Sequence, residues 1–148
     1  MVLYVPGTEE TDLKKIIMSL QLIAGQITDI QGAWSNYTPT VTSQGGTPTT
    51  VSATGRYKQI GKTVLVEISV TITDKGTATG VVFATLPVSA AAYNFAGSVF
   101  EYQTTGKSGA CYLDGVSTPS KCNTRDATGT EWWVNGYRLA YSMTYEAP

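Results

Sequence analysis

The sequence predicts a mostly β protein: an N-terminal coiled-coil helix followed by an antiparallel β-sandwich or jelly-roll-like head, assembled as a homotrimer. Apolar residues between positions 13 and 30 repeat with heptad spacing, and later segments alternate apolar and polar residues. Threonine, serine and glycine fill much of the remainder, which favours strands and turns. We expect a leading peptide at 1–12, a stem helix at 13–32 and a β head at 33–148.

The stem helix is predicted by its apolar seam. Heptad positions a and d hold Leu13, Ile16, Leu20, Ile23, Ile27 and Ile30. Thr8 or Thr11 suits the N-cap, and Gly32 suits the end of the helix. The stripe either packs on the chain's own β-domain or pairs with other copies in a parallel coiled coil. The narrow seam favours the coiled coil, and leucine at a with isoleucine at d favours three or four strands, of which we expect three.

Two long segments of the head alternate with the period of a half-buried strand. In TVLVEISVTIT, the residues at 64, 66, 68, 70 and 72 share an apolar face. In EWWV-NG-YRLAYSMTYE, Asn135-Gly136 predicts a type I′ hairpin turn. Shorter strands are expected at YTPTVTS, TGRYKQI, GVVFATL and FAGSVFEY. Roughly seven to nine strands are typical of a sandwich or jelly roll.

Residues 103–130 contain many turn-forming residues, and we expect exposed loops there. Cys111 and Cys122 lie within this segment. Two alternatives stay open for them: a pair of reduced thiols, or a disulfide that closes a loop of about ten residues.

Charge and hydropathy exclude several classes of partner. The net charge is −1 and 14% of residues are charged, so no basic surface for nucleic acid is expected. No apolar run reaches the roughly 18 residues that a membrane span requires. The start, MVLYVPGTEETD, lacks the basic and apolar regions of a secretory signal, so we expect a protein that is made and kept in a cytoplasm, or released by a route other than classical secretion.

Catalytic and cofactor chemistry have little support. The sequence contains no histidine, and two cysteines alone cannot complete a four-ligand zinc site. Five carboxylates remain for a glycosidase: Asp74, Glu101, Asp114, Asp126 and Glu131. Nothing in their spacing places any two at a catalytic separation. We therefore expect neither an enzyme nor a bound cofactor or metal, with a polysaccharide depolymerase as the weakest alternative.

Aromatic residues near the C-terminus suggest a different kind of site. Trp132 and Trp133 are consecutive, so on a strand their side chains point to opposite faces. One is expected in the core. The other, with Tyr137, could stack on a sugar ring, or could pack in the core or at a subunit interface.

Three motifs of the head resemble a family of bacteriophage and prophage virion proteins. They are W-x-x-Y-T-P-T-V-T at 34–42, G-R-Y-x-x-I-G-K-T-V at 55–64, and T-I-T-x-x-G-T-x-x-G…L-P at 71–87. The resemblance covers about a third of the chain, and the 103–130 segment falls outside it. The leading peptide followed by a helix also resembles the attachment end of small phage fibre proteins.

The resemblance implies a trimeric fibre or capsid decoration protein of the virion, assembled in the host cytoplasm. Its N-terminal peptide, with Leu3, Tyr4, Val5 and Pro6, would attach to another protein of the capsid, neck or tail. Its β head would face outward and contact the host surface. The implied partners are two further copies of the chain, a virion protein and, as an alternative function of the head, a host glycan.

Overall fold

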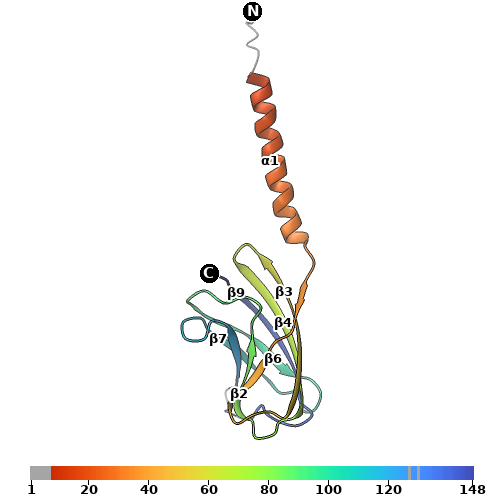
Figure 1. Cartoon of the computed structure of the whole chain (residues 1–148), viewed down its shortest axis with the longest axis vertical. Coiled ribbons are helices and arrows are strands. Elements are labelled where there is room, and N and C mark those ends of the chain that lie inside the picture. The colour runs from red at the N-terminus through yellow and green to blue at the C-terminus, as the bar shows by residue number, and fades with distance from the viewer. Residues whose placement is uncertain (1–7, 127, 130) are drawn as a thin grey trace, which may run out of the picture. The chain divides into compact units, whose positions relative to one another are not determined.

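The structure, a computed structural model, describes residues 8–126, 128–129 and 131–148. The chain divides into two compact units, Met1–Ala33 and Trp34–Pro148. The first unit contains helix α1 (Thr8–Gln31) and the second contains the strands (Figure 1). The strands are β1 (Ser35–Tyr37), β2 (Val41–Gly45), β3 (Thr50–Ile60), β4 (Thr63–Asp74), β5 (Thr79–Thr85), β6 (Asn94–Glu101), β7 (Ser108–Asp114), β8 (Lys121–Arg125) and β9 (Arg138–Glu146).

Helix α1 is longer than expected. It spans 24 residues and begins at Thr8, the earlier of the two predicted N-cap residues and five residues before the expected stem boundary at Leu13. Acidic residues 9, 10 and 12 favour an earlier start, because negative charge near a helix N-terminus interacts favourably with the helix dipole. The helix ends at Gln31, directly before Gly32, as predicted. Leu3, Tyr4, Val5 and Pro6 lie outside the described residues.

All nine strands of the described residues belong to one antiparallel sheet, in the order β1-β3-β4-β9-β6-β7-β8-β5-β2. The predicted sandwich or jelly roll of two sheets is therefore wrong. The sheet curls until its ends approach each other: the hydroxyl of Tyr37 on β1 donates to the carbonyl of Thr85 at the end of β5, at 3.4 Å. Both arrangements bury one face of every strand, so the alternation in the sequence does not distinguish them.

The inward face of this curled sheet carries the core. The alternation predicted for β4 is confirmed, because Val64, Val66, Ile68, Val70 and Ile72 are all buried. The same holds on the C-terminal segment, where Tyr137, Leu139, Tyr141, Met143 and Tyr145 are buried. β4 and β9 pair along nine residues, so these two rows line the interior side by side.

The predicted hairpin around Asn135-Gly136 does not form. Residues 131–134 are not a strand, and β9 pairs with β4 and β6. A turn is present, because the Tyr137 amide donates to the Val134 carbonyl at 3.2 Å. Gly136 has φ +87°, but no described non-glycine residue has a positive φ, so this is not a type I′ turn. The pairing of β9 with β4 and β6, which are distant in the sequence, forms in place of the local hairpin.

The 103–130 segment is more ordered than predicted, because it contains all of β7 and all of β8. Its turn-forming residues lie in the two connections that flank β7 and in the stretch that follows β8. Among the described helices, none is long and apolar enough to cross a membrane.

Candidate functional site

The first candidate site is the apolar stripe of α1. The described side chains at the a and d positions are Leu13, Ile16, Leu20, Ile23 and Ile27, and between 45% and 60% of each is exposed. Ile30 lies in the helix, but its side chain is outside the described residues. Aliphatic side chains exposed in a continuous row are the usual sign of an association surface.

The opposite side of α1 is less polar than the heptad alone indicates. Met18 and Leu22 are 69% and 66% exposed and occupy heptad positions f and c, outside the seam. They are separated by four residues, so their side chains are neighbours on the helix. Leu22 serves below as the control for the seam.

The aromatic site predicted at the C-terminal segment is not exposed. Trp132 and Trp133 are 2% and 0% exposed, and Tyr137 is 7% exposed. The expectation that one of these rings lies open for a sugar is therefore wrong. The two tryptophans precede β9 in an irregular segment, where consecutive side chains need not point in opposite directions. Both enter the core.

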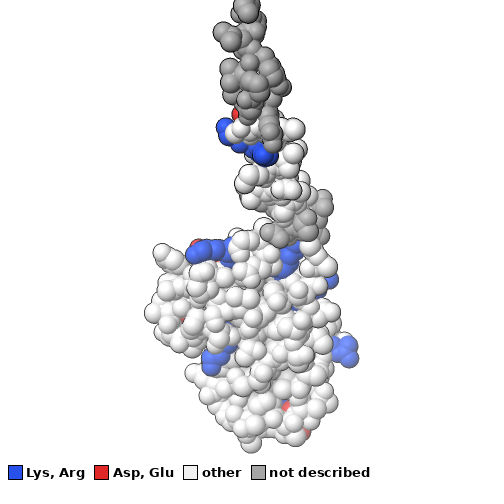
Figure 2. Space-filling model, turned by 45° about the horizontal axis from the view of Figure 1, so that its top comes forward, with Lys and Arg blue, Asp and Glu red and all other residues white. Residues whose placement is uncertain are grey.

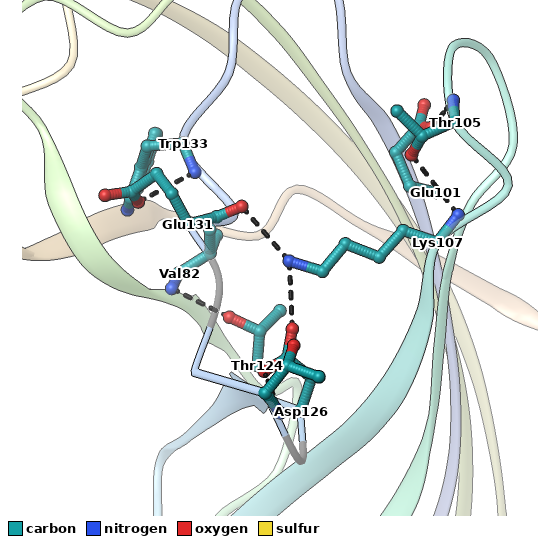
Figure 3. A network of polar contacts seen from close by, with 9 residues as sticks. Val82, Glu101, Thr105, Lys107, Thr124, Asp126, Glu131 and Trp133 are labelled. Atoms are coloured by element: carbon teal, nitrogen blue, oxygen red, sulfur yellow. Dashed lines mark hydrogen bonds and ion pairs between the residues drawn. The ribbon is translucent and has the colours of Figure 1, made fainter.

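A polar network holds the irregular segment before β9, which contains the two tryptophans, against the sheet (Figure 3). The Lys107 ammonium lies 3.0 Å from an Asp126 carboxylate oxygen and donates to the Glu131 carbonyl at 3.1 Å. It also lies 4.0 Å from the centre of the Trp132 ring. The Lys107 and Asp126 side chains are only 17% and 6% exposed, so the pair is far less screened by water than a surface salt bridge. Its role is structural, because it joins the start of β7 to the segment before β9.

Glu101 is a fully buried carboxylate at the end of β6. It accepts hydrogen bonds from the amides of Gln103, Thr104, Thr105 and Arg138, and from the Thr105 hydroxyl. Burial acts to raise its pKa, but the donors of Thr105, Gln103 and Arg138 outweigh burial and lower the pKa to about 2. Glu101 thus stabilises the turn between β6 and β7 as a charged acceptor.

The other candidate carboxylates also accept backbone hydrogen bonds near their own positions. Asp74 accepts from the Gly76 amide, Asp126 from Thr128 and Glu131 from Trp133. Asp114 accepts from two amides, and the Ser117 amide is the main reason that the Asp114 pKa is lowered. Within the described part of the chain, no three metal-binding side chains cluster.

Cys111 and Cys122 are both free thiols buried in the core. A hydrogen bond in which the Cys111 thiol donates to Cys122 raises the pKa of Cys111, and burial raises it further. The Cys111 sulfur also lies 3.9 Å from the Met143 sulfur. These contacts give the thiols a packing role in the core.

A site that the sequence did not indicate lies on the outward face of the sheet. An open hollow of about 500 Å³ is lined by Asn36, Thr54, Gly55, Arg56, Glu67, Ile68, Ser69, Ser98, Phe100, Ala140, Tyr141 and Ser142. Its residues come from β1, β3, β4, β9 and β6, which are consecutive in the sheet but not in the sequence. We call it the outer groove.

Charge is sparse and balanced around this candidate site. Within the outer groove, Arg56 and Glu67 face each other across β3 and β4, with 2.6 Å between guanidinium and carboxylate. On the face of the molecule shown in Figure 2, Lys and Arg form small separate groups on a mostly uncharged surface. Such a distribution does not resemble the continuous basic surface of a nucleic-acid-binding protein.

Comparisons with protein-family models and with curated protein sequences give no match. Among solved structures, the chain is similar to the receptor binding protein gp15 of Listeria phage PSA. The alignment covers 99% of this chain and 89% of that chain, with a TM-score of 0.50 and 18% sequence identity. The motif resemblance at 34–42, 55–64 and 71–87 gains no support from the family comparison. At this identity the likeness concerns the fold: the chain shares its fold with a phage receptor binding protein.

Proposed function

We propose that this chain is a non-enzymatic bacteriophage virion protein that forms a trimeric fibre or decoration appendage. Three copies associate through the seam of α1, and the β head of each copy faces the host surface. The residues before the helix, including Leu3, Tyr4, Val5 and Pro6, contact another protein of the capsid, neck or tail.

One observation carries the proposal: a helix with an exposed aliphatic seam is joined to a β domain that has the fold of a phage receptor binding protein. A 24-residue helix is about 36 Å long, enough for three heptads of seam. Trimeric display also suits a surface-binding head, because several weak contacts then act together at high effective concentration.

Sedimentation of the full chain at micromolar concentration tests the assembly. We expect a species with three times the mass of the chain. A monomer at every concentration up to about 100 µM would contradict the fibre, because α1 would then have no partner for its seam.

Labelling tests the location. Antibodies against the head should label projections on particles produced by the genome that encodes this chain, and should label few or none after the gene is deleted. Absence of the chain from purified particles would exclude a virion protein even if the chain is a trimer in solution.

A second candidate function is a carbohydrate-binding module. The buried Trp132, Trp133 and Tyr137 give it no support, but the outer groove does, since hydroxyl side chains and an exposed aromatic ring line it together. A head that binds glycans as a monomer and is absent from particles would favour this candidate over the fibre.

A further inference from the structure

We infer that the outer groove binds an uncharged oligosaccharide of the host surface. The inference deepens the proposed function and rests on its claim that the head contacts that surface. It assigns the contact to residues on β3, β4, β9 and β6, and not to the tryptophans that the sequence indicated.

The register of the sheet aligns the groove residues in two rows. One row runs Asn36, Arg56, Glu67, Ser142 and Ser98 across five strands. The second runs Thr54, Ser69, Ala140 and Phe100 across four of them. Every member of each row is a direct cross-strand neighbour of the next, so the sheet backbone sets the spacing of the side chains. A site on a rigid sheet loses little entropy when it binds a ligand.

The small side chains of the rows form a hydroxyl-lined floor. Thr54, Ser69, Ser98 and Ser142 all line the groove. A hydroxyl both donates and accepts, and so do the hydroxyls of a sugar, so the two surfaces are chemically matched. Small residues also create the hollow itself, whose volume of about 500 Å³ lies within the range of small-ligand sites.

Charge in the groove is compensated. Both the Nε and an Nη of Arg56 contact one carboxylate oxygen of Glu67, at 2.7 and 2.6 Å. The guanidinium also lies 4.9 Å from the centre of the Trp34 ring, which holds it on the groove side of β3. The pair leaves no net charge to attract an anionic or a cationic ligand, while its remaining N–H and oxygen atoms can bond hydroxyls.

Phe100 adds an apolar surface to this polar floor. It is 46% exposed although its strand neighbours Val99 and Glu101 are buried. An aromatic ring at the wall of a hydroxyl-lined groove can stack against the C–H face of a pyranose. Hydroxyl side chains beside one exposed ring suit a sugar. A peptide segment would instead bind at the free edge of a sheet or in a hydrophobic groove.

A second copy of the chain is the competing occupant of this face. Cores of subunit interfaces are enriched in aromatic residues and methionine and depleted in serine. The groove instead contains three serines and no methionine, and only one of its aromatic rings, that of Phe100, is exposed. The helix seam, which is aliphatic throughout, is the better surface for self-association.

The test measures binding of the full-length protein to immobilised neutral glycans, namely hexose and N-acetylhexosamine oligosaccharides of one to six units. Sulfated, phosphorylated and uronic-acid glycans serve as charged comparators. The variants are Phe100→Ala, which removes the ring, and Ser142→Gln, which fills the floor. Thr144→Gln is the matched control, because Thr144 is exposed on the same strand and the same face but does not line the groove.

We expect at least one neutral glycan to bind, a loss of at least tenfold in affinity for F100A and S142Q, and unchanged affinity for T144Q. If S142Q does not fold, Ser98→Gln makes the same test, since Ser98 lies directly opposite Ser142. Binding only to charged glycans, no binding to any glycan, or binding that both variants retain would overturn the inference.

Sedimentation of the same samples separates this inference from the fibre proposal. A trimer that binds no glycan overturns the outer groove as a sugar site and leaves the fibre intact. A monomer that binds through the groove overturns the trimer and leaves the sugar site intact. A change of mass in S142Q but not in T144Q would show that another copy covers the groove, and would also overturn the inference.

Discussion

At the scale of single residues, Glu101 makes the free energy of unfolding depend on pH. Its pKa in the folded protein is lowered to about 2, from an ordinary value of 4.5. The folded state therefore binds the proton more weakly than the unfolded chain, and the stabilisation is complete above about pH 4.5. It is lost as the pH falls toward 2. Urea unfolding between pH 2 and 7 should show a decline in the free energy of unfolding in this window.

Glu101→Gln tests the assignment. The amide keeps the shape but loses the charge, and its NH2 group faces backbone donors. We expect E101Q to be about 2 kcal/mol less stable at pH 7, because hydrogen bonds to a charged acceptor are lost. The variant should also show a weaker decline toward low pH. An unchanged decline would assign the acid sensitivity to other carboxylates.

The two cysteines should not react with thiol reagents in the folded protein. Burial and the Cys122 contact raise the pKa of Cys111, so almost no thiolate forms there at neutral pH. A thiol reagent such as Ellman's should titrate no thiol natively and both thiols in denaturant. Silence in denaturant as well, with a mass lower by two hydrogens, would establish the disulfide alternative.

At the scale of elements, a charge placed in the α1 seam should dissociate the trimer, whereas a charge two residues away, outside the seam, should not. Leu20 and Leu22 are 60% and 66% exposed, but only Leu20 lies in the seam. Leu20→Asp should dissociate the trimer, because a buried a-position leucine contributes about 3 kcal/mol per chain and the carboxylate opposes burial. Leu22→Asp should remain trimeric. Equal effects of the two substitutions in sedimentation would argue against the heptad assignment.

Local pattern predicted the individual elements better than it predicted their partners. The alternation of β4 and β9 identified which side chains enter the core, because every second side chain of a half-buried strand faces the core and the others face water. Asn135-Gly136 indicated a turn correctly but a hairpin wrongly. Trp132 and Trp133 lie outside any strand, so the strand argument about their opposite faces did not apply to them. Lys107, which pairs with Asp126, lies over the Trp132 ring, and no local pattern connects these three residues.

At the scale of the whole molecule, the strand order creates a surface site that the sequence does not indicate. The outer groove joins Arg56, Glu67, Ser142 and Phe100, which are brought together because β9 inserts between β4 and β6. Each strand by itself shows a mostly polar outward face, a pattern shared with any solvent-facing strand. A surface site made of such residues becomes visible only when the order of the strands is known.

The division into two units predicts independent unfolding. The core lies wholly within Trp34–Pro148, whereas α1 has no core of its own. An isolated helix of 24 residues is marginal in water, so α1 should depend on association while the head does not. In the Leu20→Asp variant, we expect a weaker helical circular dichroism signal than in the parent protein. The midpoint for head unfolding, followed by tryptophan fluorescence, should stay within about 2 °C of the parent protein. A head that melts much earlier in the variant would mean that the trimer stabilises the head directly, and the stem and head would then have to be treated as one cooperative unit.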